Sequence, residues 1–410
     1  MLLVQKFGGS SLATTDHIRR VAERVARTVA EGHQVVVVVS AMGDSTDDLL
    51  AKARDLSTTL PPREMDALLA TGEMQSIALM AMALETAGVP ARSFTGPQAG
   101  IRTDGQHGNA RITGVEPRRL RQALALGLTP VVAGFQGEGP DGDITTLGRG
   151  GSDLTAIALA GALEADRCEI YSDVAGVFTA DPRVVPDAAK LAHLPYSDML
   201  ELAAQGAQVL QTKAVEYAWD RNVTIHARST FEEEDPGTVI DGHPSVTLSP
   251  VTAVALNTHI AKIGLTGVPD APGVAARLFE ALAAKGINVD LIIQSLSHDQ
   301  LNDMAFTVAE ADTDRAVAEA ERVLAELHGR AVVVDRGVAK VSAVGTGMLG
   351  RPGVAARVFR ALADAGINIE LIGTSEIKIS CLIAREHAHR ALKAVHEAFN
   401  LGEGAIQVEE

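Results

Sequence analysis

Cysteine is nearly absent from this 410-residue sequence, which contains only Cys168 and Cys381. Two cysteines are too few for a disulfide framework, so the chain fits a reducing, cytoplasmic compartment. Aromatic residues are also scarce, at 3% of the chain, whereas glycine is abundant, with 38 residues. Many glycines beside few aromatic side chains favour an α/β protein with tight strand-to-helix turns and small-ligand sites.

Positive charge is in deficit, with 36 Lys and Arg against 52 Asp and Glu and a formal net charge of −16. That balance argues against a nucleic-acid partner, because neutralising phosphates needs clustered cations. The longest apolar run, residues 77–84, is far shorter than the ~18 residues of a membrane-spanning helix. The first residues, MLLVQKFGG, lack the basic and long apolar segments of a secretory signal. We therefore predict a soluble protein without a membrane partner, whose length allows two to four domains at roughly 100–200 residues each.

The first half of the chain alternates apolar strand-like runs with helical periodicity. Strands are predicted at residues 2–4, 35–39, 130–135 and 168–171. One helix places Ile18, Val21, Val25 and Val29 on one face, with Asp16 as its expected cap. Another is expected over residues 153–164, capped by Ser152. Strands that are apolar throughout predict a largely parallel sheet covered on both faces, up to about residue 245.

The second half contains an internal repeat. The segment PGVAARLFEALAAKGINVDLI (272–292) returns as PGVAARVFRALADAGINIELI (352–372), at a constant offset of 80 residues. Each copy predicts a strand, a Pro-Gly loop, a helix, a glycine turn and a strand. Two copies are too few for a solenoid, so we interpret the pair as a sensor module that holds a ligand at an interface. Duplication for stability alone is the alternative.

Two glycine-rich segments favour anion binding. In KFGGSS, adjacent Gly8 and Gly9 after a strand let backbone N–H groups approach a phosphate, and Lys6 adds a point charge. In TTLGRGGSD, three glycines surround Arg149, which can hold a carboxylate through two parallel hydrogen bonds. Three glycines cost conformational entropy, so a functional interpretation is favoured for this segment.

Other residues leave two interpretations open. Ser40, at the end of an apolar strand, and Thr46 fit either ligand binding or helix capping. Glu73 follows Thr71-Gly72, which we expect to interrupt a helix; it fits the helix dipole or a substrate ammonium group. Asp173 and Arg183 lie in a long segment that suits either a nucleotide or a surface loop. Together, these segments suggest a small carboxylate or amine and a phosphorylated nucleotide. The HExxH and CxxC metal motifs are absent, and no metal-ligating residues are predicted.

These segments resemble the aspartokinases, in order and along essentially the whole chain. The matching stretches are KFGGSS, SAMGDSTDDLL, TGE, FTGPQAGIRTDGQHGNARI, VVAGFQG, TTLGRGGSD, YSDVAGVFTADPR and the repeat PGVAAR…INxxLI. The resemblance implies a three-layer amino-acid kinase domain with a mostly parallel central sheet, followed by two ferredoxin-like (βαββαβ) ACT domains. The implied bounds are 1–245, 258–338 and 339–410, and a strand at 250–257 would complete the last domain.

The resemblance also implies an activity: ATP, with Mg²⁺ on its phosphates, phosphorylates the side-chain carboxylate of L-aspartate. The product, 4-phospho-L-aspartate, is the first intermediate towards lysine, threonine and methionine. The implied catalytic residues are Lys6 and Asp153. Those implied to bind the nucleotide are Lys6, Phe7, Gly8, Gly9, Ser172, Asp173, Phe178, Thr179, Ala180, Asp181, Pro182 and Arg183. Those implied to bind aspartate are Ser40, Thr46, Glu73, Phe135, Arg149, Gly150, Gly151 and Ser152.

For the repeats, the resemblance implies feedback inhibition by lysine, threonine or both, in a homo-oligomer formed through the ACT domains. The implied effector contacts are Asp270, Ala275, Gln294, Asn368, Ser375 and Glu376. One departure concerns Gln208, which stands where many relatives carry a lysine near the nucleotide; Lys213 follows further on.

Two other functions compete with this interpretation. One is a kinase for glutamate or acetylglutamate, against which the tandem repeat and the combination of TGE with GRGGSD argue. The other is a non-catalytic amino-acid-binding regulator, against which Lys6, Arg149 and Asp153 argue. For a kinase, the chemistry needs no general base, because an aspartate carboxylate with a pKa near ~3.9 is already ionised at neutral pH.

Overall fold

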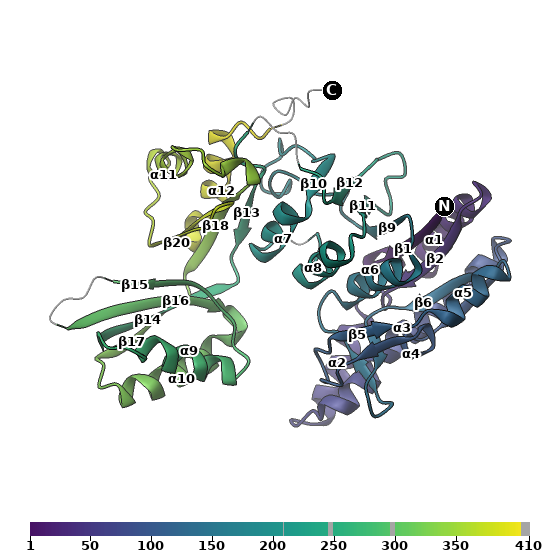
Figure 1. Cartoon of the computed structure of the whole chain (residues 1–410), viewed down its shortest axis with the longest axis horizontal. Helices are drawn as coiled ribbons and strands as arrows, with labels where there is room; N and C mark the ends of the chain where they lie inside the picture. The colour runs from purple at the N-terminus through teal and green to yellow at the C-terminus, as the bar shows by residue number, and fades with distance from the viewer. Residues whose placement is uncertain (208, 245–248, 296–299, 403–410) are drawn as a thin grey trace. The chain divides into compact units, whose positions relative to one another are not determined.

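The chain forms two compact units in the computed structural model, which describes residues 1–207, 209–244, 249–295 and 300–402 (Figure 1). Unit 1 comprises Met1–Val177, Lys190–Ala203 and Gln208–Ser245, and unit 2 comprises Phe178–Ala189, Ala204–Ala207 and Val246–Glu410. The sequence predicts a first domain that runs without interruption from residue 1 to residue 245. The segment Phe178–Ala189 belongs instead to unit 2, because its apolar side chains join that unit's core.

Unit 1 is built on an eight-stranded sheet in the order β10-β12-β11-β9-β1-β2-β6-β3. All neighbouring strands are parallel except β11 and β12. The strands are β1 (Leu2–Phe7), β2 (Gln34–Val39), β3 (Ala91–Phe94), β6 (Thr129–Ala133), β9 (Arg167–Ser172), β10 (His193–Pro195), β11 (Ile225–Ser229) and β12 (Thr238–Asp241). The run Val35–Val39 is buried on both faces, as expected for a central parallel strand.

Helices cover both faces of this sheet. Those of unit 1 are α1 (Thr15–Ala30), α2 (Ser45–Leu56), α3 (Pro62–Thr86), α4 (Gly96–Ala99), α5 (Arg118–Ala125), α6 (Gly151–Leu163), α7 (Tyr196–Ala204) and α8 (Thr212–Arg221). Alternate residues of β2, including Val37, share one core with α1 and α3. Helix α6 packs with α8 and against β1 and β9, and is buried on nearly all sides. The layers are therefore helix, sheet and helix.

Two predicted helix starts need correction. Helix α1 is capped by Thr14, whose side-chain oxygen accepts the His17 N–H, and Asp16 lies inside the first turn. Helix α6 begins at Gly151 with Gly150 as its cap, so Ser152 lies inside the helix.

The expected break at Thr71-Gly72 is also wrong, because α3 runs without interruption through both residues and Glu73 lies at its middle. Gly72 serves close packing: a Cβ there would lie 2.8 Å from Ala41 Cβ. Length and composition alone would let α3 cross a membrane. It packs instead against α1, α2 and β3 and carries the buried acids Asp66 and Glu73, which identifies it as a core helix.

A second, smaller sheet of unit 1 lies beside α3 in the order β5-β4-β7-β8. Its strands are β4 (Ile101–Thr103), β5 (Ile112–Val115), β7 (Gln136–Glu138) and β8 (Ile144–Thr146). Strands β7 and β8 form an antiparallel hairpin in which Gln136 pairs with Thr146. The Arg149 loop follows β8 directly, so the hairpin sets where that loop starts.

Unit 2 contains the two repeats, each with a four-stranded antiparallel sheet. The first orders its strands β15-β16-β14-β17, and α9 and α10 lie together on one face (Figure 1). Its elements are β14 (Ile260–Pro269), α9 (Val274–Ala284), β15 (Val289–Gln294), β16 (Leu301–Ala309), α10 (Thr313–Glu326) and β17 (Ala331–Asp335). This succession is the βαββαβ pattern.

The second repeat orders its strands β13-β18-β20-β19. Its elements are β13 (Ala253–Asn257), β18 (Val338–Val344), α11 (Val354–Asp364), β19 (Leu371–Thr374), β20 (Lys378–Ala384) and α12 (Ala388–Ala398). Strand β13 pairs with β18 in the way that β17 pairs with β14, so a strand that precedes both repeats takes the sixth position in the second. Short 3₁₀ turns complete the chain at Ser10–Leu12, Glu310–Asp312, Thr346–Met348 and Arg385–His387.

Candidate functional site

Four loops of unit 1 meet at the carboxyl edge of the parallel sheet. They follow β1, β2, β6 and β9, and backbone hydrogen bonds join them. The Gly8 N–H donates to Tyr171 O at 3.2 Å, the Ser40 N–H to Phe7 O at 3.1 Å, and the Gly134 N–H to Val39 O at 3.0 Å. Carboxyl edges of parallel sheets are where open α/β folds bind ligands. The loops that carry Gly8, Ser40, Phe135 and Asp173 therefore share one edge.

A buried ion pair stands at this edge. Lys6, the penultimate residue of β1, and Asp153, in the first turn of α6, are each 8% exposed. Lys6 Nζ lies 2.6 Å from Asp153 Oδ1, but the two are not aligned as a hydrogen bond, and Oδ1 has no aligned donor. The pair thus places a cation beside the Gly8-Gly9 turn without committing its N–H groups to Asp153. A phosphate oxygen can accept a hydrogen bond from such a lysine.

Glycine is required where the loops approach closely. A Cβ on Gly9 would lie 3.0 Å from Ala41 O and 3.1 Å from Gly43 O. Gly150, at a φ of 73°, faces the side chain of Gln211 at a distance that leaves no room for a Cβ.

The side chain of Phe7, in contrast, is fully buried and stacks on Tyr171, with ring centroids 4.8 Å apart. Phe7 would therefore contact a nucleotide through its backbone, and its expected role in nucleotide binding stays a prediction.

Glu73 is a buried carboxylate with one free oxygen. Its side chain is 3% exposed, and Oε1 accepts the Ala41 N–H at 3.1 Å. Oε2 is buried and has no hydrogen-bond partner among the residues that the structure describes. Burial raises the pKa of Glu73 from 4.5 to about 7, because the ionised form has lost its water. An ammonium group would satisfy both the free oxygen and the negative charge. Ser40 and Thr46, both half-buried, lie in the segment that Glu73 contacts.

The loop after β8 carries Arg149 at its exposed tip. Within the described ranges, the Arg149 side chain makes no hydrogen bond or ion pair. Phe135 lies against this loop at a φ of 70°, which is uncommon for a residue other than glycine. Its N–H donates to Thr155 Oγ1 at 3.1 Å and its carbonyl accepts the Leu147 N–H at 2.9 Å, and these bonds hold the conformation. The guanidinium of Arg149 is therefore available for an anion.

The segment expected to bind the nucleotide is divided between the units. Ser172 ends β9 in unit 1, and Asp173 follows it and is exposed. Residues 178–183 belong to unit 2, where Asp181 and Arg183 pair with each other. Thr179 is fully buried: its hydroxyl contacts His396 Nε2 and Leu401 O, each at 2.9 Å, and Ala180 joins the same core. These two side chains therefore pack inside unit 2, and the expected contact of this segment with ATP stays a prediction.

The remaining nucleotide candidates are Lys213 and Gln208. Lys213 lies on α8, and its Nζ donates to Asn109 Oδ1 at 2.6 Å. Gln208 lies outside the described residues.

The six expected effector residues are spread over both repeats. Asp270 follows β14 and accepts from Asn302 Nδ2 at 3.4 Å, while Ala275 lies in the first turn of α9 and Gln294 ends β15. Asn368 precedes β19, and the turn that follows β19 holds Ser375 and Glu376. All except Ala275 are exposed. Over the described stretches, no hydrogen bond or ion pair links the members in one repeat to those in the other.

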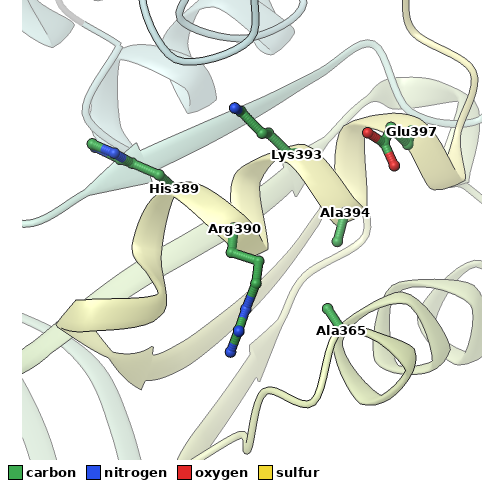
Figure 2. A pocket seen from close by; sticks show the side chains of 6 residues that line it. All are labelled: Ala365, His389, Arg390, Lys393, Ala394 and Glu397. Atoms are coloured by element: carbon green, nitrogen blue, oxygen red, sulfur yellow. The ribbon is translucent and has the colours of Figure 1, made fainter.

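A pocket of about 480 Å³ lies elsewhere in unit 2, on α12 and the end of α11. Figure 2 shows the side chains that line it: Ala365, His389, Arg390, Lys393, Ala394 and Glu397. None of the predicted site residues lines this pocket. In the part of the chain that the structure describes, no three His, Cys, Asp or Glu side chains are grouped to bind a metal ion.

Sequence reasoning missed Asp66, which is fully buried on α3. It binds the loop before β5 and the end of β8 through three donors. The sequence feature that could have identified Asp66 is its place on the helix. It lies seven residues before Glu73 on the same helix, so the two acids share one face.

Comparison with known families finds matches over both halves of the chain. The model of the amino acid kinase family matches residues 1–228, and an ACT-domain model matches residues 263–324 and 341–399. An aspartokinase of Mycolicibacterium smegmatis is 52% identical over 409 residues, which cover 98% of this chain and 96% of the relative.

Among solved structures, E. coli aspartokinase III in complex with aspartate and ADP superposes with a TM-score of 0.83 at 26% identity, covering 98% of this chain and 100% of that one. The same enzyme in complex with lysine and aspartate superposes with a TM-score of 0.75 at 27% identity, covering 97% of this chain and 99% of that one.

Proposed function

We propose that this chain, which belongs to the aspartokinase family and is an aspartate kinase, converts L-aspartate and ATP to 4-phospho-L-aspartate and ADP. The reaction is the first step towards lysine, threonine and methionine. The observation that supports it most is the buried, unpartnered Oε2 of Glu73, whose helix contacts the Ser40 loop beside the Lys6–Asp153 pair. A free carboxylate oxygen that faces the loop after β2, next to the strand that carries Lys6, suits an amino-acid substrate of a kinase.

The ammonium group and one carboxylate of aspartate each have a matching group in unit 1. The ammonium pairs with Glu73, and the guanidinium of Arg149 binds a carboxylate with two parallel hydrogen bonds. Ser40, Thr46, Phe135 and the backbone at Gly150–Ser152 surround the rest of the molecule. The side-chain carboxylate attacks the γ-phosphoryl group directly, because it is already ionised and no proton has to be removed.

Phosphoryl transfer then depends on positioning and on charge stabilisation. Lys6 is the cation for the γ-phosphoryl oxygens, and Asp153 fixes its Nζ. The Gly8-Gly9 turn supplies backbone N–H groups, and Ser172 and Asp173 lie at the adjacent loop for the nucleotide. The two substrates are both anions and the chain carries a net charge of −16, so these local cations offset a repulsive background.

The residues also fit Mg²⁺ held mainly by ATP. Asp153 Oδ1 is the buried carboxylate oxygen at the edge without an aligned donor, and the described residues hold no acidic cluster that could bind the ion alone. Magnesium prefers oxygen ligands and commonly uses one or two carboxylates together with substrate phosphates. When bound there, it would neutralise charge on the phosphates.

Unit 2 is the proposed sensor for lysine, threonine or both. Asp270 and Glu376 offer carboxylates for an effector ammonium, and the Pro-Gly turns before α9 and α11 offer backbone N–H groups for a carboxylate. The lysine complex of E. coli aspartokinase III supports this role by similarity. We also propose a homo-oligomer formed through the ACT domains: the edge strand β17 exposes Val333 and Val334, which an assembled interface would cover.

Coupled measurement of ADP release tests the proposal. L-aspartate should support turnover, whereas L-glutamate and N-acetyl-L-glutamate should not. Lysine and threonine, added separately and together at millimolar concentration, should inhibit. Turnover with glutamate alone would favour a different amino-acid kinase, and amino-acid binding without ADP release would favour a regulator. We place the reaction in the cytoplasm, consistent with two free, buried cysteines.

A further inference from the structure

Asp66 is a buried acid with three hydrogen-bond donors, and it lies outside the proposed substrate contacts. It is 0% exposed on α3. Its Oδ1 accepts the Thr146 hydroxyl at 2.5 Å and the Gly108 N–H at 3.0 Å, and its Oδ2 accepts from His107 Nδ1 at 2.7 Å. A buried carboxylate loses its hydration, so three donors are what makes its ionised form tolerable there.

These donors come from the two segments that adjoin Arg149. Thr146 ends β8, three residues before Arg149, and its carbonyl accepts the Ala110 N–H at 2.9 Å. Gly148, at a φ of 76°, lies close to this segment: a Cβ there would lie 2.9 Å from Asn109 Oδ1 and 3.4 Å from Gly108 O. Asp66 therefore holds, through Thr146 and Gly108, the two segments that flank the start of the Arg149 loop at the end of β8.

Glu73 lies seven residues further along the same helix and faces the Ser40 loop. Between the two acids, the carbonyl of Ala70 accepts from Gln136 Nε2 at 3.1 Å, and Gln136 pairs with Thr146 across the β7–β8 hairpin. One rigid helix thus connects the proposed ammonium site with the base of the proposed carboxylate site. A helix rises about 1.5 Å per residue, so a span of seven residues sets a separation of about 10 Å along its axis.

We propose that Asp66 is a positioning residue for substrate binding: it fixes the distance between Glu73 and Arg149 by anchoring the β7–β8 hairpin to α3. Asp66 is argued to act through Thr146 and the backbone. The inference rests on the proposed roles of Glu73 and Arg149 in binding aspartate. It goes beyond them by naming the group that sets their spacing.

His107 has the matching role on the loop side. Its Nδ1 is bonded to Asp66, its side chain is 23% exposed, and Nε2 has no partner within the described stretches. If His107 acts only by anchoring its loop, the hydrogen bond from its Nδ1 to Asp66 is the interaction that a substitution must preserve. The side-chain amide of asparagine can replace that donor but not Nε2.

The test uses full-length enzyme and substitutions that differ by single groups. Thr146→Val removes the donor to Asp66 with little change in shape, and Thr146→Ser restores it. His107→Asn keeps a donor for Asp66, whereas His107→Ala loses it. The matched control is Arg63→Ala, which removes an exposed ion pair between Arg63 on α3 and Asp143, the residue just before β8. That pair also links α3 to the β7–β8 hairpin, but it lies on the surface, where an ion pair contributes little to stability.

We expect Thr146→Val and His107→Ala to raise the KM for aspartate about 10-fold or more, because misplacing a binding group by about 1 Å can cost up to ~100-fold. The KM for ATP should change less than about twofold. Thr146→Ser, His107→Asn and Arg63→Ala should behave like the wild type. Calorimetric titration with L-aspartate should show the same loss of affinity, and circular dichroism should show that every variant is folded.

Other outcomes would overturn the inference. Unchanged aspartate KM in Thr146→Val, an equal rise of both KM values, or an equal effect of Arg63→Ala would leave Asp66 as a general stabilising residue. His107→Asn behaving like His107→Ala would assign the effect to Nε2. If the wild type itself neither bound nor phosphorylated aspartate, the proposed substrate site would fail first, and the inference that rests on it would fail too.

Discussion

Replacing Glu73 with glutamine should abolish a pH dependence of aspartate binding that the wild type shows near neutrality. Glutamine keeps the acceptor for the Ala41 N–H and the size of the side chain, but it removes the negative charge. Burial holds the pKa of Glu73 at about 7, and only the ionised form can pair with a substrate ammonium. Aspartate binding should therefore weaken as the pH falls through that value.

The expected magnitude follows from the ionised fraction. About one enzyme molecule in ten has Glu73 ionised at pH 6 and about nine in ten at pH 8, so the KM for aspartate should be roughly tenfold higher at pH 6. Glu73→Gln should show no such slope. Its KM should exceed the wild-type value at pH 8 by about 10-fold or more, since hydrogen bonds to charged groups contribute about 1.5–3 kcal/mol.

The same shift predicts how stability depends on pH without aspartate. The unfolded chain releases the Glu73 proton near pH 4.5, and the folded chain near pH 7. Between these values ionisation favours the unfolded state, so stability falls as the pH rises and then levels off above about 7. The contribution is on the order of 3 kcal/mol, at 1.36 kcal/mol per pKa unit. Glu73→Gln lacks this contribution.

The assay is ADP release at saturating ATP from pH 6 to pH 8, with thermal unfolding of both proteins over pH 4.5–8 without aspartate. The terminal phosphate of ATP also titrates near neutrality, so the wild-type KM is compared with that of Glu73→Gln at each pH. A flat wild-type profile, or an equal slope in both proteins, would refute the assignment of Glu73 to the ammonium group.

Four further substitutions test the other assignments. Lys6→Ala should lower kcat by about 100-fold or more while changing the KM for aspartate little, because Lys6 acts on transition-state charge; near-normal kcat would exclude this role. Arg149→Lys should raise the KM for aspartate about tenfold and leave that for ATP unchanged, since lysine loses the two-pronged donor geometry; the reverse pattern would reassign Arg149. Asp270→Ala should relieve inhibition by lysine or threonine, a coupling of typically ~1–3 kcal/mol, without altering uninhibited kcat; unchanged inhibition would contradict the effector role. Thr179→Val should lower the unfolding free energy of unit 2 by about 1–3 kcal/mol, because it leaves buried groups of Ala189, His396 and Leu401 unpaired; calorimetry showing an unchanged transition would contradict this.

Local patterns in the sequence determined most of the fold. The run Val35–Val39 is apolar at every position, and such a run has few solutions other than a strand covered on both faces. The repeat at an offset of 80 residues required two similar modules, and the structure contains two matching sheets. Glycines beside Lys6 and Arg149 indicated close approach before any neighbour was known. In each case the sequence signal lies within the segment whose structure it predicts.

Contacts between distant segments were decided only by the tertiary structure. Thr71-Gly72 suggested a helix break because glycine costs about 1 kcal/mol relative to alanine in a helix. The close approach of Ala41 to Gly72 is the reason for glycine there, and α3 continues. Residues 178–189 follow a strand of unit 1 but pack in unit 2, because Thr179 and Ala180 find their partners near the end of the chain. Asp66 shows the limit most clearly: its partners are 41, 42 and 80 residues away. No local periodicity contains such separations, since they exist only once the sheets and helices have closed around the acid.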